Sequence, residues 1–411
     1  MKILIVNTKD LLGGAARASY RLHNALLAEK ADSYLLVQDK QSDSHKVISQ
    51  SSTREKILGK LRPLLDTLPL KFYKNRTSSD FSTSWFGNNS LIRKINEINP
   101  DIVHLHWVNN GMIQIEQLKK IKAPIVWSLH DMWAFTGGCH YNGTCESYKV
   151  NCGMCPVLGS KKETDLSRKI WNRKLKTFKE LPNLTIIGLS KWMKEAAKQS
   201  SLMENLNVIN LPNPIDTTVF KPFDKKLSRE IWNLPKNKKL ALFGAMAATS
   251  DSRKGFSELV KAVNALKITN LELVVFGSSE PKTSPKFNFK THYVGTLNDD
   301  VSLTSLYNAV DVMIVPSLQE NLSNAIMESL SCGTPVVGFN IGGNKDMVEH
   351  KKTGYLAKPY NVFELSLGIE WVLNFPNQNK LLKNSREKVL KEFDSHVVAQ
   401  KYLELYTKIL N

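Results

Sequence analysis

Two glutamate residues, Glu320 and Glu328, stand eight positions apart in the stretch VPSLQENLSNAIMESLSCGTPVVGFNIGGNKDMVE. A strand is expected to end at Pro316 and a helix to begin near Leu322, with Glu328 on that helix. Eight helical residues rise roughly 12 Å, which is about the span from a hexose, past a diphosphate, to a ribose. Free amides at the helix N-terminus would face the phosphates. The spacing therefore suits a nucleotide sugar, although two glutamates so spaced are more often a solvated helix face.

A second candidate is the lysine of the segment GAMAATSDSRKGF, which follows the expected strand LALFGA. Lys254 follows this strand end and opens a helix, where a cation can neutralise a departing diphosphate. Arg253 stands next to it. The alternative is an ordinary exposed lysine at the start of a helix.

Gly13 and Gly14 follow the first expected strand and precede a helix. Such a pair lets the backbone approach a ligand and turns helix amides towards phosphate, although turns also use Gly-Gly. Its place at the carboxyl end of a strand, where open α/β sheets bind ligands, strengthens the functional interpretation.

His130 and Asp131 end the expected strand PIVWSLH and would face the same crevice. A histidine at the carboxyl end of a strand is better placed for function than one inside a core, so we favour a functional role over a structural one. His104 and His106 are weaker candidates, which we expect to line the cleft wall.

Four cysteines crowd into GGCHYNGTCESYKVNCGMCP: Cys139, Cys145, Cys152 and Cys155. Four thiolates could close a tetrahedral structural zinc site, and His140 could replace one of them. Only one Cys-x2-Cys pair is present, so free thiols that pack a loop are an equal alternative. Two disulfides are not expected, because a reducing compartment is indicated.

Buried, β-rich runs alternate with helical patterns along the 411 residues, which indicates parallel sheets with helices on both faces. We expect an α/β chain with an N-terminal Rossmann-like domain over residues 1–212 and a C-terminal one over 213–393, joined at the proline-rich LPNPIDTTVFKP. A last helix within 394–411 is expected to pack back towards the first domain. The expected strands begin at Lys2, Ser33, Asp101, Pro124 and Leu184, and then at Leu240, Leu271, Val312 and Pro335.

The Glu-x7-Glu pattern, the Cys-Gly-Thr-Pro-Val-Val run and the Gly342-Gly343 pair resemble the signature of the family 4 glycosyltransferases. The resemblance covers nearly the whole chain and is specific in the C-terminal half. It implies the GT-B fold, with two Rossmann-like domains whose parallel sheets face each other across a cleft, and sugar transfer with retention of anomeric configuration. A similar HDMW…Cys segment occurs in a subset of bacterial polysaccharide glycosyltransferases, including colanic-acid-type enzymes.

The resemblance also implies roles for individual residues. Glu320 matches the residue that contacts the donor sugar, with the amides of Asn321 and Leu322 beside it, and Glu328 matches the one that holds the ribose. Lys254 matches the phosphate-binding lysine. Many members carry an arginine six positions before this lysine, where this chain has Ala248. Arg253 is expected to take the place of that arginine. The Gly13-Gly14 loop is expected against the donor phosphates or the acceptor, and His130 against the donor sugar or the acceptor.

These assignments predict a retaining, metal-independent hexosyltransferase that acts on a glycan or lipid-linked acceptor in surface polysaccharide synthesis. No Asp-x-Asp metal motif occurs, so no cofactor is expected for catalysis, and zinc would be structural. The fold also admits a nucleotide-sugar epimerase, a phosphorylase or a non-catalytic binding protein. No lysine pattern nominates a pyridoxal phosphate site, and the presence of both glutamates argues against a binding protein.

The formal net charge of +18 favours anionic partners, and no nucleic-acid motif is found. No signal peptide or membrane span is evident, so we expect a cytoplasmic protein, peripheral on the inner face of the plasma membrane. The segment 54–76, REKILGKLRPLLDTLPLKFYKNR, carries seven basic and two acidic residues and leucines at helical spacing. It could dock on anionic lipid through Lys56, Lys60, Arg62, Lys71 and Lys74, or it could pack its leucines onto the sheet.

Overall fold

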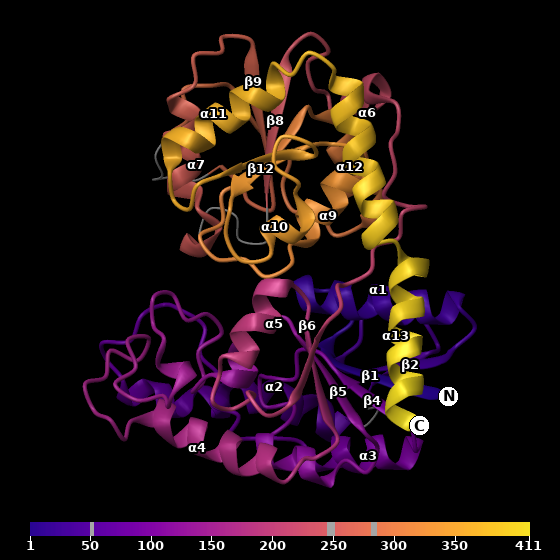
Figure 1. Cartoon of the computed structure of the whole chain (residues 1–411), viewed down its shortest axis with the longest axis vertical. Coiled ribbons are helices and arrows are strands. Elements are labelled where there is room, and N and C mark those ends of the chain that lie inside the picture. The colour runs from indigo at the N-terminus through magenta and orange to yellow at the C-terminus, as the bar shows by residue number, and fades with distance from the viewer. Residues whose placement is uncertain (50–52, 245–250, 281–285) are drawn as a thin grey trace. The chain divides into compact units, whose positions relative to one another are not determined.

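The computed structural model describes residues 1–49, 53–244, 251–280 and 286–411 (Figure 1). The chain divides into two compact units. Unit 1 comprises Met1–Asn213 and Ala399–Asn411, and unit 2 comprises Pro214–Val398. The first division falls in the proline-rich segment, and the second falls within the last helix, α13 (Ser395–Leu410). The expected α/β class is confirmed, because each unit carries its own parallel sheet.

Unit 1 is built on a seven-stranded sheet with the order β3-β2-β1-β4-β5-β6-β7, in which all neighbours are parallel. This order reverses between β1 and β4, which is where open α/β sheets bind ligands. Gly13 follows β1, His106 follows β4 and His130 follows β5, so all three lie at the carboxyl edge of the sheet. The strands are β1 (Lys2–Lys9), β2 (Asp32–Asp39), β3 (Val47–Ser49), β4 (Ile102–Leu105), β5 (Ile125–Leu129), β6 (Leu184–Gly188) and β7 (Asn207–Asn210).

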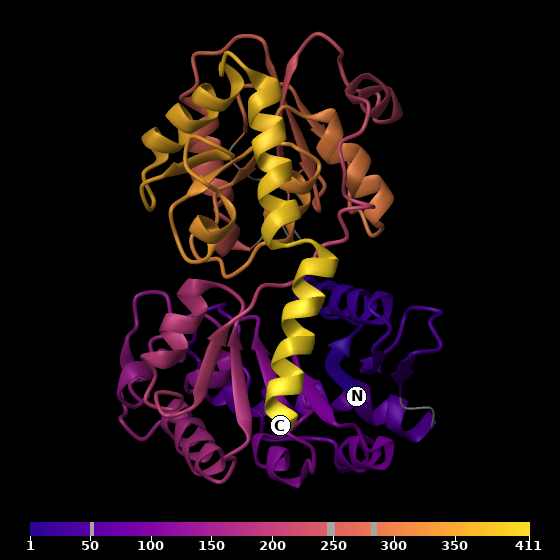
Figure 2. The same ribbon diagram turned by 45° about the vertical axis from the view of Figure 1, so that its right-hand side comes forward.

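Helices flank this sheet because successive strand side chains point to opposite faces. Val103 and Leu105 of β4 join a large apolar cluster with α3, α4 and α5, whereas His104 lies on the other face. There it meets Tyr402 and Tyr406 of α13, which runs alongside the strands in Figure 2. The α-helices of unit 1 are α1 (Gly14–Ala28), α2 (Thr53–Thr67), α3 (Asn89–Ile98), α4 (Leu166–Lys179) and α5 (Lys191–Lys198), and its short 3-10 helices are Leu68–Phe72, Ile115–Lys120, Trp133–Phe135 and Ser147–Lys149.

Unit 2 repeats the plan on a six-stranded parallel sheet, in the order β10-β9-β8-β11-β12-β13. The order reverses between β8 and β11, and the two loops that carry Lys254 and Glu320 follow these two adjacent strands. The strands are β8 (Lys239–Gly244), β9 (Leu271–Phe276), β10 (Thr291–Tyr293), β11 (Val312–Val315), β12 (Val336–Phe339) and β13 (Gly354–Ala357). The helices are α6 (Lys225–Ile231), the 3-10 helix Ser252–Lys254, α7 (Phe256–Asn264), α8 (Asp300–Ala309), α9 (Asn324–Ser331), α10 (Asn344–Met347), α11 (Val362–Leu373) and α12 (Gln378–Glu392).

The helix expected to begin near Leu322 begins two residues later. Ser323 takes the N-cap position with an extended backbone (φ −73°, ψ 119°), so α9 starts at Asn324. Asn321 and Leu322 therefore belong to the loop, and a continuous helical rise from Glu320 to Glu328 does not apply.

Candidate active site

Lys254 and Glu320 form a largely buried ion pair in unit 2. Their side chains lie 2.9 Å apart, from the lysine Nζ to the glutamate Oε2, and are 19% and 10% exposed. Ser317 donates a second hydrogen bond to the same carboxylate oxygen at 3.3 Å. The two residues singled out from the sequence as donor-binding are thus brought together, although 66 positions separate them.

The charges around Glu320 keep it ionised. Burial alone would raise the pKa of this carboxyl, but the positive charges of Lys254 and Arg253 and the hydrogen bonds from Lys254 and Ser317 outweigh burial, and the pKa lies below its ordinary value. The pair is therefore a preformed acceptor beside a preformed cation at neutral pH.

Two glycines allow the loops of this pair to approach closely. Gly255 follows Lys254 in the left-handed conformation (φ +71°), and a Cβ there would lie 2.0 Å from the carbonyl oxygen of Pro316. Gly342 (φ +46°) lies against the backbone of Glu320, whose carbonyl oxygen would be 1.9 Å from an added Cβ. Since neither site has room for a side chain, the Gly342-Gly343 pair of the sequence motif serves to seat Glu320.

Arg253 is held beside the pair by neighbouring loop groups. Its guanidinium donates to the Asp251 carboxylate at 2.9 Å and to the Gln319 carbonyl at 3.4 Å. Its own carbonyl accepts the amide of Leu318 at 2.8 Å, which ties the two loops together. Ala248, where many family members have arginine, lies outside the described residues.

Glu328 sits apart from the ion pair, on α9. It is buried, and its carboxylate accepts a hydrogen bond from the hydroxyl of Tyr307 on α8 at 2.9 Å. Asn321 and Leu322, which follow Glu320 directly, are buried as well. Tyr307 and Ser317 were not expected from the sequence, because nothing in their local pattern marks them as partners of the glutamates.

In unit 1, the Gly13-Gly14 loop leads from β1 into α1. Gly13 is the N-cap residue with φ 110°, a conformation that favours glycine, and an added Cβ would meet nothing within 4 Å. The space beside this helix start is therefore open. The preceding Asp10 is fully buried and accepts the amides of Gln41 and Ser42, which fixes the neighbouring loop.

His130, which is half-buried, ends a row of three histidines whose other two members, His104 and His106, are buried. His106 Nδ1 lies 2.8 Å from His130 Nε2, and His104 bonds to Tyr406 Oη at 2.6 Å and to Ser128 Oγ at 2.8 Å. Burial lowers the pKa of His130 to about 4, against an opposing effect of the Asp131 charge. Burial also lowers the pKa of His104 to about 3 and that of His106 well below its ordinary value.

Asp131 anchors the segment that follows His130. Its carboxylate accepts hydrogen bonds from His140 Nδ1 at 2.7 Å, from the Trp107 indole at 2.9 Å and from the Trp133 amide at 2.8 Å. The other ring nitrogen of His140 bonds to Ser82 Oγ at 2.8 Å. Because both nitrogens are engaged, the expectation that His140 could replace a cysteine as a metal ligand does not fit this arrangement.

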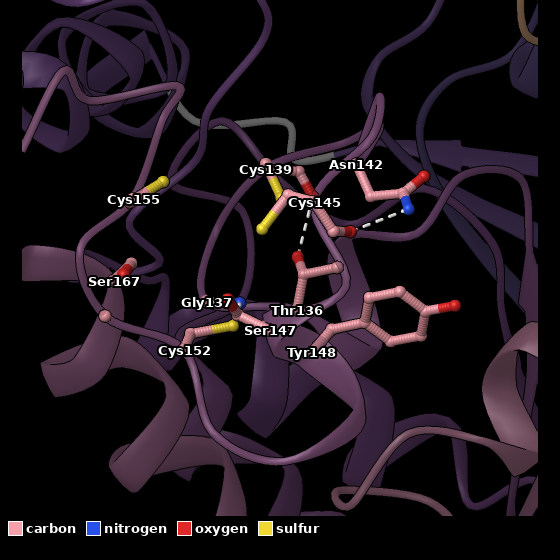
Figure 3. A pocket seen from close by; sticks show the side chains of 11 residues that line it. Thr136, Gly137, Cys139, Asn142, Cys145, Ser147, Tyr148, Cys152, Cys155 and Ser167 are labelled. Carbon is pink, nitrogen blue, oxygen red and sulfur yellow. Dashed lines mark hydrogen bonds between the residues drawn. The ribbon is translucent and has the colours of Figure 1, made fainter.

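The four cysteines from Cys139 to Cys155 line one small cavity in unit 1 (Figure 3). Burial raises the pKa of Cys139 and of Cys152 to about 12. As the side chains stand, no three His, Cys, Asp or Glu residues in the described part of the chain are arranged to hold a metal ion.

Comparison with known proteins places these sites in context. A family model described as Glycosyltransferase Family 4 matches residues 12–219, just over half of the chain, and one described as Glycosyl transferases group 1 matches residues 224–389. The chain is 26% identical over 389 residues to the putative colanic acid biosynthesis glycosyl transferase WcaC of Escherichia coli (strain K12), with 89% of each protein covered.

Two further proteins are similar over different spans. The UDP-Gal:alpha-D-GlcNAc-diphosphoundecaprenol alpha-1,3-galactosyltransferase of Escherichia coli is 25% identical over 225 residues, which cover 52% of this chain and 57% of that protein. The crystal structure of Anabaena HepE in complex with UDP and glucose superposes with a TM-score of 0.65 at 16% identity, over 99% of each chain. The structural likeness confirms the expected GT-B fold.

The three histidines of this row predict how stability depends on pH. Because the pKa values of His104, His106 and His130 are lowered, the unfolded chain binds protons below about pH 6.5 that the folded chain does not. Their contribution to stability is complete above that pH and is lost as the pH falls towards about 4. We expect His106→Gln to reduce the slope of unfolding free energy between about pH 6 and pH 5 by about 1 kcal/mol per pH unit.

Urea denaturation followed by tryptophan fluorescence measures this slope. His45→Gln, which replaces an exposed histidine, is the matched control and should keep the wild-type slope. An unchanged slope in His106→Gln would show that His106 takes up its proton equally in both states.

Proposed function

Since the chain belongs to glycosyltransferase family 4, we propose that it transfers a sugar from a nucleoside diphosphate sugar to a glycan or lipid-linked acceptor in bacterial surface polysaccharide synthesis. The ion pair of Lys254 with Glu320 carries this proposal, because it combines a cation for phosphate with a carboxylate for sugar hydroxyls. The names of two relatives support the substrate class: one is named a putative colanic acid biosynthesis glycosyl transferase, and the other a galactosyltransferase that uses UDP-Gal and a diphosphoundecaprenol-linked acceptor. HepE, which was solved with UDP and glucose, supports a uridine diphosphate sugar as the first donor to test.

In this proposal the diphosphate is neutralised by protein groups. Lys254 provides the nearest cation, Arg253 adds charge beside it, and the first turn of α9 offers amides that no Ser323 side-chain cap occupies. Glu328, oriented by Tyr307, accepts the ribose hydroxyls, since a carboxylate can accept several hydrogen bonds at once. Gly13 and Gly14 hold the loop after β1 open to phosphate or acceptor.

The reaction breaks the bond between the sugar C1 and the diphosphate oxygen, whose electron pair leaves with the nucleoside diphosphate. The acceptor hydroxyl forms the new bond on the same face of the ring and gives its proton to the departing diphosphate oxygen, so the anomeric configuration is retained. Glu320 orients the donor sugar, and neutral His130 contributes a hydrogen bond to donor or acceptor. Fixed positive groups stabilise the charge that develops on the leaving diphosphate, and no divalent metal is required.

We also propose that the protein associates with an anionic membrane surface. In the described residues, no helix is both long and apolar enough to cross a bilayer. Helix α2 and the 3-10 helix after it instead present apolar side chains to solvent: Ile57, Leu61, Leu64, Leu65, Leu68 and Phe72, of which Leu64 is 65% and Phe72 88% exposed. Leu61, Leu64, Leu65 and Leu68 are therefore exposed and do not pack onto the sheet, which the alternative expected. We call the set of six the α2 apolar face.

The α2 apolar face is exposed because α2 is anchored by its polar residues. Asp66 is buried and accepts the Thr83 hydroxyl at 2.8 Å and the Trp85 amide at 2.7 Å. Arg62 is also buried and pairs with Glu55 at 2.7 Å, so it does not contribute to a charged surface as the sequence suggested. The exposed lysines Lys60, Lys71 and Lys74 remain beside the α2 apolar face, and the side chain of Lys56 lies outside the described part of the chain. Apolar and basic groups together suit an anionic leaflet.

The proposed reaction predicts that Lys254→Ala and Glu320→Gln each lower kcat by about 10²–10³-fold, because each removes one preorganised partner of the transition state. The measurement is release of UDP from UDP-sugars on addition of a polyprenyl-diphosphate glycan, with the anomeric configuration of the product read by NMR. Lys261→Ala, on the exposed side of α7, is the control and should retain wild-type turnover. Undiminished turnover in a folded Lys254→Ala variant, or an inverted product, would contradict the mechanism.

Turnover should not depend on added divalent metal, since Lys254, Arg253 and helix amides do the work of a metal at the diphosphate. The test is the initial rate after brief treatment with EDTA, with and without added Mg²⁺ or Mn²⁺. We expect equal rates in all three conditions. Recovery of a lost rate only on addition of Mg²⁺ or Mn²⁺ would overturn metal independence.

Membrane docking predicts sedimentation with anionic vesicles that weakens as salt is raised. Each basic residue near the surface contributes about 1 kcal/mol, so neutralising Lys60, Lys71 and Lys74 to Gln should weaken binding by about 10²-fold. The control neutralises three exposed lysines of unit 2, namely Lys261, Lys267 and Lys286. If both triple variants bind vesicles equally, the α2 segment is not the anchor.

A further inference from the structure

A long irregular segment connects the end of β5 to α4, and it holds all but one of the cysteines. Between Phe135 and Leu166, the structure assigns one short 3-10 helix, Ser147–Lys149, as regular structure. Segments of this length without strands or helices are uncommon in compact domains and need specific contacts to hold one conformation. Cys155 and Leu158 of the segment enter the small apolar cluster beneath it, with Cys139 and Val157 packed against that cluster, and Tyr148 and Cys152 enter the large core of unit 1.

The four cysteines of this segment line one cavity of about 20 Å³. Figure 3 shows their side chains among those that line it. That volume accommodates one water-sized or ion-sized occupant. The nearest polar side chains are engaged elsewhere: Thr136 donates to the carbonyl of Cys139 at 2.6 Å, and Asn142 donates to that of Cys145 at 2.8 Å. The cavity therefore offers mainly sulfur to whatever occupies it.

The backbone between Cys152 and Cys155 bends at Met154. Gly153 and Met154 both have positive φ, 151° and 45°, and the value at Met154 is uncommon for a residue with a side chain. Such strained positions persist where the surroundings or a ligand over-determine them. This bend carries the Cys-x2-Cys pair that structural zinc sites use as a unit.

A buried lysine lies beside the cysteines. Lys174 of α4 is fully buried, and its side-chain nitrogen donates to two neutral carbonyls, those of Trp133 and Thr136. Lys174 thus ties α4 to the start of the segment that carries the four cysteines.

We propose that Cys139, Cys145, Cys152 and Cys155 bind one zinc ion as thiolates. Four sulfur ligands suit zinc and exclude magnesium and calcium, which prefer oxygen. Binding releases the thiol protons and turns the sulfur atoms about their Cα–Cβ bonds into the cavity that they line. The ion is structural: it fixes the segment whose His140 holds Asp131, next to His130.

Metal analysis of the full chain tests the proposal. Protein purified under reducing conditions from zinc-supplied cells, without a metal-affinity step, should contain one zinc per chain by mass spectrometry. Cys152→Ser with Cys155→Ser should lose the zinc, and Cys332→Ser, at the buried cysteine outside the segment, should keep it. Because the readout is metal content, it is independent of sugar transfer.

Two further measurements keep the proposal falsifiable if the double variant does not fold. Cobalt added to metal-stripped, reduced wild-type protein should give the absorption bands of a tetrahedral thiolate complex. Thiol titration after denaturation with a chelator should count five free thiols, since the chain has five cysteines. Wild-type protein without zinc that also fails to bind cobalt would overturn the proposal, and so would a thiol count below five, which indicates disulfides.

Discussion

The ion pair between Lys254 and Glu320 is the contact on which the unit 2 site depends. It can form only because β8 and β11 are neighbours and because two glycines let the loops after them come within backbone contact. A buried pair of this kind adds little to stability, since both ions lose their hydration. Removing one partner, however, leaves the other charge uncompensated. The fold therefore holds in place a cation and an anion, and a bound ligand can separate the two.

A bound diphosphate would compete with Glu320 for Lys254. It carries more negative charge than one carboxylate, so the lysine shifts towards phosphate, and the carboxylate becomes an acceptor for sugar hydroxyls. The low pKa of Glu320 ensures that the carboxylate is ionised before the donor arrives. Gly342 matters to this exchange as much as the charges do, because it fixes the backbone from which Glu320 extends. In the proposed reaction, the two charges that already face each other take the place of a metal.

The sequence predicted the central strands of both sheets but missed β3, β7, β10 and β13. These are the four edge strands, each three or four residues long. In β3, β7 and β10, half-buried or exposed positions interrupt the apolar run. Residue types at the site were predictable from strand ends, whereas the pairing of Lys254 with Glu320 was not, because strand order decides it. The amphipathic pattern of α2 was also visible. Which side faces solvent was not, because the buried contacts of Asp66 and Arg62 determine it.

The three histidines of the row in unit 1 are uncharged at neutral pH, because their pKa values are lowered. Between two neutral imidazoles one nitrogen donates and the other accepts, so the tautomer of His130 is coupled to that of His106. His104 lies against His106 with ring centres 4.4 Å apart, and a proton on either ring would repel one on the other. Desolvation by burial is the larger cause of the low pKa values of His104 and His106. His130 is thus kept uncharged in a chain of net charge +18. In the proposed reaction, His130 therefore acts by hydrogen bonding, and Lys254 and Arg253 supply the positive charge.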